Sequence, residues 1–140
     1  MTLEPGLSAS VTLTVTEADT AQALGSGDVP VLATPRLLAL AEAATVRATA
    51  RHLPAGTTTV GTRVALDHLA ATPIGGTVTV AAQLSTVDGR RLTFVVTAAD
   101  GSADIARGSV ERVLVDRERF LAKAADTAAH SKVGDAKAGG

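Results

Sequence analysis

The stretch that decides the fold covers residues 34–73 and reads TPRLLALAEAATVRATARHLPAGTTTVGTRVALDHLAATP. Its first half places Leu and Ala at helical spacing until Pro54 and Gly56 interrupt the pattern. Thr34 is a favoured N-cap residue, and Pro35 suits the first helical position, where a missing N–H costs nothing. The stretch therefore predicts one long helix, capped by Thr34 and with a narrow, Ala-rich buried face.

Strand patterns surround this helix. Apolar and polar residues alternate with the period of a half-buried strand. Strands are expected at residues 9–17, 57–70, 77–87, 90–99 and 102–115. The dipeptides Asp88-Gly89 and Asp100-Gly101 favour tight type I′ hairpins. The order of one strand, one helix and four strands in a meander predicts an α+β fold, in which one antiparallel sheet covers the helix.

Two further segments join or follow these elements. Residues 18–33 contain two glycines and a proline, so we expect a flexible loop with at most one helical turn, around Ala21, placed where it can act as a lid. A short helix is expected from Asp116. Residues 1–125 are expected to form a single domain, whereas residues 126–140, which include His130, have the composition of a flexible tail.

Composition excludes several classes of protein. The net charge of -1 and the mixed charges give no basic stripe, which argues against nucleic acid as a partner. There is no cysteine, no signal peptide pattern and no apolar run long enough to span a membrane, so we expect a cytoplasmic protein. Hydrophobic residues make up 46% of the chain but only two are aromatic. A core of such small side chains hints at extra burial in a homodimer.

His68 is the first candidate functional residue. On strand parity it shares a face with Val60, Val64 and Leu66, so it should point toward the helix or a neighbouring cleft. It is either a core histidine bonded to a backbone carbonyl or a general acid or base near neutral pH. The three histidines are scattered, so no metal site is predicted.

Glu42 and Thr34 are the next candidates. A carboxylate on an Ala-rich and Leu-rich face needs a partner, and Glu42 either turns outward to pair with Arg36 or Arg47 or is partly buried and reactive. Thr34 either caps the helix or, at its positive N-terminal end, helps to bind a carbonyl oxygen.

Arg90 and Arg91 follow a turn glycine. They form either a solvated face or a basic pair that contacts a phosphorylated substrate such as coenzyme A.

Together these motifs resemble a known family. Thr34 precedes Glu42 by eight residues, Gly61 leads to His68, and DGRRL at residues 88–92 follows further along the chain. This arrangement resembles the fluoroacetyl-CoA thioesterase family of hotdog-fold enzymes, over roughly residues 9–125. The resemblance implies a five-stranded antiparallel sheet wrapped around a long central helix, and a homodimer with its two sites at the interface.

The resemblance also implies residue roles. Thr34, Glu42 and His68 would be the catalytic set, with Glu42 as nucleophile or water activator, His68 as acid and base, and Thr34 as a hydrogen-bonding partner. Gly61 would lie beside the acyl group. The implied substrate is an acyl-CoA, with coenzyme A as part of the substrate and no separate cofactor.

One segment departs from the family pattern. The fluoroacetyl-specific member has phenylalanines just before the catalytic threonine, whereas residues 25–33 here read GSGDVPVLA. We therefore expect hydrolysis of a small acyl-CoA without a fixed preference for fluoroacetyl. The alternative is a protein that binds an acyl thioester without cleaving it.

Overall fold

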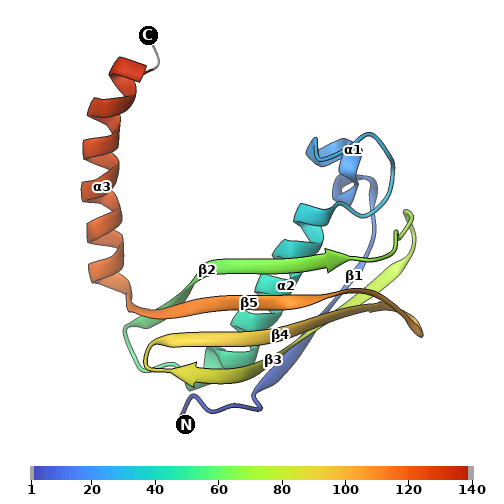
Figure 1. The fold of residues 1–140 in the computed structure, drawn as a ribbon, viewed down its shortest axis with the longest axis horizontal. Helices are drawn as coiled ribbons and strands as arrows, with labels where there is room; N and C mark the ends of the chain where they lie inside the picture. Colours follow the sequence, from blue (N-terminus) through green and yellow to red (C-terminus); the bar gives the residue numbers. More distant parts are fainter. Residues whose placement is uncertain (1, 139–140) are drawn as a thin grey trace.

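The computed structural model describes the backbone of residues 2–138 and side chains as far as residue 128, and in this part of the chain five strands form one antiparallel sheet (Figure 1). The strands are β1 (Ser8–Thr14), β2 (Thr57–His68), β3 (Thr77–Asp88), β4 (Arg91–Asp100) and β5 (Ala103–Asp116). The α-helices are α1 (Ala21–Leu24), α2 (Thr34–Thr49) and α3 (Arg117–Ala138), and single 3₁₀ turns lie at η1 (Glu17–Asp19) and η2 (Ala50–His52). The predicted α+β class is confirmed.

Helix α2 lies on one face of the sheet and packs mainly on β1 and β3. Its buried side is formed by Leu37, Leu40 and three alanines, which let the helix approach the strands closely. Two threonines are also buried there: Thr45 donates to the carbonyl of Glu42 at 2.6 Å, and Thr49 to that of Thr45 at 3.2 Å. Their hydroxyls are therefore satisfied inside the core.

The strand order is β1-β3-β4-β5-β2. The expectation of a four-strand meander is thus wrong for β2, which pairs with β5 at the far edge instead of with β3. The reason is the length of the connections: β3, β4 and β5 are joined by two-residue turns, whereas residues 69–76 are long enough to carry the chain across to the other side of the sheet. The two edge strands are β1 and β2.

Both hairpin turns differ from the expected type. Gly89 and Gly101 have φ of 59° and 61°, and no residue other than glycine has a positive φ in the described backbone. A type I′ turn needs positive φ at both central residues, which Arg90 and Ser102 do not provide. One glycine at the first central position is the pattern of a type II′ turn.

Strand β2 contains a β-bulge between Gly61 and Arg63. Gly61 faces α2 before the bulge, and His68 lies on the half-buried helix-facing side after it. The expected common face of Val60 and His68 is therefore wrong, because the extra residue Thr62 shifts the alternation by one position.

Residues 17–33, here called the cap, are more structured than the expected loop. They contain η1 and α1, and isolated bridges pair Thr20 with Leu32 and Val31 with Pro73. Asp19 adds two further links, since its side chain accepts from the Thr16 backbone at 2.8 Å and from Nε of Arg36 in α2 at 2.9 Å. The cap is thus attached at its base to the helix and to the segment after β2.

Helix α3 is much longer than the short helix expected from Asp116. It runs from Arg117 to Ala138, where residues 126–140 were expected to form a tail. Alanine and lysine are strong helix formers, which explains the extension. The side chain of His130 lies outside the described part of the chain.

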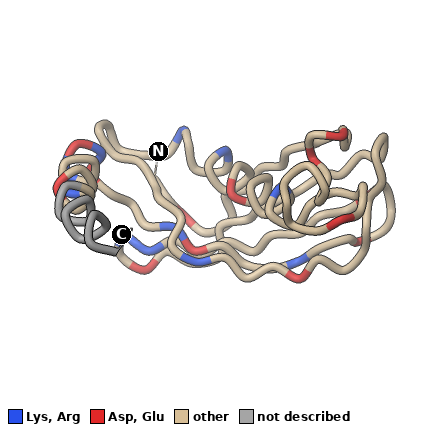
Figure 2. Tube along the Cα trace, turned by 90° about the horizontal axis from the view of Figure 1, so that it is seen from above, with Lys and Arg blue, Asp and Glu red and all other residues tan. Residues whose placement is uncertain are grey.

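Charged residues are mixed along the chain, and Figure 2 shows no stripe of one sign over the described residues. None of the helices in the described part combines the length and apolarity needed to cross a membrane.

Candidate active site

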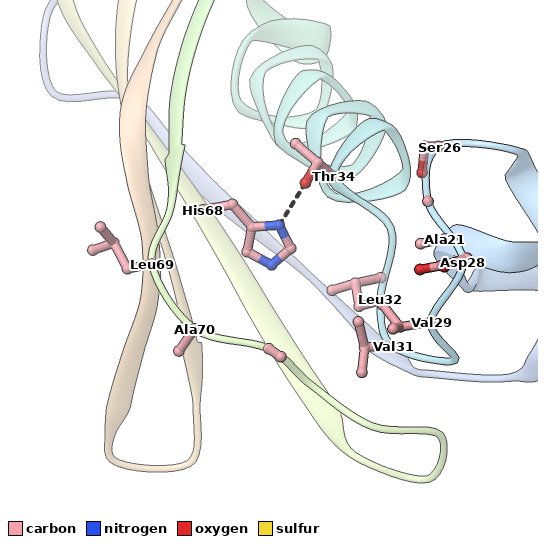
Figure 3. Close-up of a pocket in the computed structure, with 12 residues that line it drawn as sticks. Ala21, Ser26, Asp28, Val29, Val31, Leu32, Thr34, His68, Leu69 and Ala70 are labelled. Carbon is pink, nitrogen blue, oxygen red and sulfur yellow. Dashed lines mark hydrogen bonds between the residues drawn. The ribbon is translucent and has the colours of Figure 1, made fainter.

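The structure brings Thr34 and His68 together. The Oγ1 atom of Thr34 lies 2.8 Å from Nδ1 of His68, so the first turn of α2 contacts the end of β2 directly (Figure 3). Ala33, not Thr34, occupies the N-cap position, and Thr34 is the first helical residue. The predicted capping role is therefore wrong, and the hydroxyl is available for the histidine.

The surroundings of His68 favour its neutral form near physiological pH. Burial disfavours the imidazolium and lowers the pKa of His68 from 6.5, while the backbone of Ala70 acts in the opposite direction. Its second nitrogen, Nε2, is buried and has no hydrogen-bond partner among the described residues. A neutral imidazole fixed at one nitrogen by a hydroxyl can accept or return a proton at the other.

A cavity of about 360 Å³ opens beside this pair. On one side it is lined by the cap, and on the other by His68 and the residues that follow β2 (Figure 3). The lining residues are Ala21, Ser26, Gly27, Asp28, Val29, Val31, Leu32, Thr34, His68, Leu69, Ala70 and Ala71. This volume suits a small ligand group.

Glu42 has a partner that the sequence analysis missed. Nη1 of Arg112, on β5, donates to Oε2 of Glu42 at 3.0 Å. The Arg112 side chain is only 8% exposed and is also held by Thr59, through its hydroxyl at 2.9 Å and its carbonyl at 3.0 Å. Burial lowers the pKa of Arg112, and the Glu42 carboxylate opposes this shift, so Glu42 favours the charged form of Arg112.

Gly61 lies directly against the same carboxylate. A Cβ atom placed on Gly61 would collide with Oε2 of Glu42 and come within 3.3 Å of Nη1 of Arg112. The φ of Gly61 is not positive, so glycine is not required here for its backbone freedom. It is required because any side chain would occupy the space of the Glu42 carboxylate.

These residues form two separate groups within one chain. Glu42 is eight residues from Thr34, about 12 Å along the helix, and Gly61 is about 20 Å from His68 along β2. No hydrogen bond joins Glu42 to His68 or Thr34 in the described part of the chain. The Thr34–His68 pair and the Glu42–Arg112 pair are thus distinct.

Arg90 and Arg91 lie at the other end of the sheet. Arg91 pairs with Val113 of β5, whereas His68 pairs with Ala106, seven residues away on the same strand. Both arginines are exposed. Within one chain they are therefore far from the Thr34–His68 pair.

Neither predicted partner of Glu42 pairs with it. Nε of Arg36 donates to Oδ1 of Asp19 at 2.9 Å, and Arg47 donates to the carbonyl of Ser10 at 2.9 Å. The backbone of Thr16, followed by Arg36, holds the pKa of the buried Asp19 carboxyl below its usual value. This ion pair joins the cap to the first turn of α2.

Comparison with known proteins now identifies the family. Residues 15–118 match the family described as fluoroacetyl-CoA-specific thioesterase. The chain belongs to that family. A relative from Streptantibioticus cattleyicolor, a fluoroacetyl-CoA thioesterase, is 46% identical over 93 residues, which are 66% of this chain and 67% of that protein. The resemblance stated from the sequence is confirmed.

Solved structures support the same conclusion. A structure of the fluoroacetyl-CoA thioesterase is 37% identical with a TM-score of 0.82, covering 89% of this chain and 96% of that chain. A thioesterase superfamily member from Thermus thermophilus is 25% identical with a TM-score of 0.85, covering 93% and 96%. A hot-dog-like protein from Thermanaerovibrio acidaminovorans, 24% identical with a TM-score of 0.81, covers 88% and 91% and shares the fold. The predicted hotdog fold is confirmed.

Proposed function

We propose that this member of the family is a homodimeric enzyme that hydrolyses small acyl-CoA thioesters. The observation that carries the proposal is the 2.8 Å contact between Thr34 and His68 at the wall of a cavity sized for a small acyl group. Water adds to the acyl carbon, the C–S bond breaks, and the products are a carboxylate and free coenzyme A. Family membership supports the reaction type.

The chain's own residues can divide this work. His68 is neutral and can take a proton from water and return one to the leaving thiolate. Thr34 orients the imidazole. Glu42, fixed by Arg112 beside Gly61, would activate water or attack the acyl carbon.

A second copy of the chain is needed to unite these groups. Strand β2 is a 12-residue edge strand whose helix-facing side, including Val64 and Leu66, is only half-buried. An unpaired edge of this length is a template for another strand. If two β2 strands pair antiparallel about a two-fold axis between Val64 and Ala65, His68 of one chain lies opposite Gly61 of the other. The partner's Glu42 then approaches the Thr34–His68 pair.

The same antiparallel arrangement directs the Arg90 end of one chain toward the His68 end of its partner. Arg90 and Arg91 are exposed and stay our proposed contacts for the phosphates of coenzyme A. A cytoplasmic location also stays a prediction.

The test is release of free thiol from a panel of short acyl-CoAs by the wild type, His68→Ala and Glu42→Ala. We expect turnover by the wild type and a loss of at least about a hundredfold in each variant. Equal turnover by all three proteins would refute the assigned roles. Binding of acyl-CoA without turnover by any of them would instead support the alternative of a binding protein.

A further inference from the structure

The cap places polar groups across the cavity from the catalytic histidine. Ser26 and Asp28 line the cap side of the cavity, whereas His68 lines the opposite side (Figure 3). Both are part of the segment that has no aromatic residue. The acyl cavity of this chain is therefore not a purely apolar one.

The position of these groups is fixed by the cap itself. The amide of Ser26 donates to the carbonyl of Ala21 at 3.0 Å, and that of Gln22 donates to the carbonyl of Val29 at 3.3 Å. A Cβ atom on Gly27 would lie 3.3 Å from the Cβ of Ala21, so this turn packs closely on α1. Ser26 and Asp28 are the residues directly before and after Gly27. The close packing of Gly27 on α1 therefore holds both of them in place.

The carboxylate of Asp28 has no hydrogen bond or ion pair with another residue in the described part of the chain. Among the residues that the structure describes, no lysine or arginine lines the cavity, and the nearby Arg36 is engaged by Asp19. His68 is the other ionisable lining residue, and its pKa is lowered. The charge that a substrate meets in the cavity is therefore negative.

From these contacts we infer that the enzyme selects acyl groups that carry a hydrogen-bond donor, a hydroxyl or an ammonium group, near their far end. Asp28 accepts from the donor, while Val29, Val31 and Leu32 contact the carbon chain. An acyl group with a terminal carboxylate is repelled, and one with a terminal methyl leaves Asp28 without a partner. This inference rests on the proposed thioesterase function and names the substrate class of the same site.

The expected strength of the substrate preference follows from the exposure of Asp28 to solvent. A hydrogen bond to a charged group is strong, but this side chain is exposed and water screens it. We therefore expect a donor-bearing acyl group to be favoured by about tenfold in kcat/KM over its methyl analogue.

The test compares four acyl-CoAs of nearly equal size: butyryl, 3-hydroxypropionyl, 3-aminopropionyl and malonyl. Their acyl groups end in a methyl, a hydroxyl, an ammonium and a carboxylate group. Thiol release is measured for the wild type, for Asp28→Asn, and for Glu4→Gln as the control. Glu4 is an exposed carboxylate just before β1, which forms the opposite edge of the sheet from β2.

In the wild type we expect the hydroxyl and ammonium substrates to exceed butyryl-CoA by about tenfold, and malonyl-CoA to be the poorest. Asp28→Asn should remove most of the ammonium preference and relieve the exclusion of malonyl-CoA, while Glu4→Gln should change neither. Ratios within about twofold of one another, or unchanged by Asp28→Asn, would overturn the inference but leave the thioesterase intact. If the wild type hydrolyses none of the four and no acetyl-CoA, the proposed function fails and the inference falls with it.

Discussion

The separation of Glu42 from the Thr34–His68 pair gives a prediction about which chain supplies each catalytic residue. The two groups are about 12 Å apart along α2 in one chain, several times the length of the 2.8 Å contact between Thr34 and His68. A site that uses both Glu42 and His68 should therefore draw them from different chains. Two inactive variants, His68→Ala and Glu42→Ala, should then complement each other.

The expected magnitude follows from two-fold symmetry. In a heterodimer with His68→Ala in one chain and Glu42→Ala in the other, one site loses both residues and the other keeps both. Such a heterodimer should have about half of the wild-type activity per dimer. If instead each site used Glu42 and His68 of the same chain, both sites would lack one residue and activity would stay at the level of the single variants.

The assay uses coexpression of the two variants with different affinity tags, two-step purification of the heterodimer, and thiol release from the best acyl-CoA. The mirror control pairs a wild-type chain with a chain carrying both substitutions. A shared site predicts that this control is inactive, whereas a same-chain site predicts about half activity. Activity in the control and none in the complemented pair would refute the reasoning, as would a monomer by light scattering.

Three further predictions concern single features of the site. Because burial lowers the pKa of His68 below 6.5, kcat/KM should keep its plateau as the pH falls through 6.5 and decline only below it; a midpoint above 6.5 in the pH profile would contradict this. Gly61→Ala should displace the Glu42 carboxylate and lower kcat by about tenfold to a hundredfold, with a retained cooperative unfolding transition, at a lower midpoint because Arg112 loses its partner, as evidence that the fold persists. Replacing Arg90 and Arg91 by glutamine should raise KM for acyl-CoA by about fivefold and leave N-acetylcysteamine thioesters, which lack phosphates, unaffected; equal effects on both substrates would exclude phosphate contacts.

The fold was largely predictable because its signals are local. Period-two alternation located the strands, and proline and glycine located the end of the helix. The place of β2 was not predictable in this way, since strand pairing across a long connection depends on which edge buries the apolar face. The turn type also escaped prediction, because an Asp-Gly pair does not by itself show which residue takes positive φ.

The site was partly predictable for a similar reason. Thr34 and His68 were recognised from sequence and meet in the structure. Arg112 was missed, although its place between Val110 and Leu114 on the inward parity of β5 is a readable signal that a buried charge needs a partner. The role of Asp28 could not be predicted from the sequence, because it depends on where the fold places the cap.

The bulge at Thr62 lets two residues of β2 that are an odd number of positions apart face the same helix. Gly61 and His68 are seven positions apart, and in a regular strand an odd separation places two residues on opposite faces. One extra residue cancels that mismatch, so both face α2. Deleting Thr62 would also leave both residues facing inward, but would shorten β2 by one step. The bulge thus sets the spacing between histidine and glycine, and with it the alignment of two chains across the β2 edge.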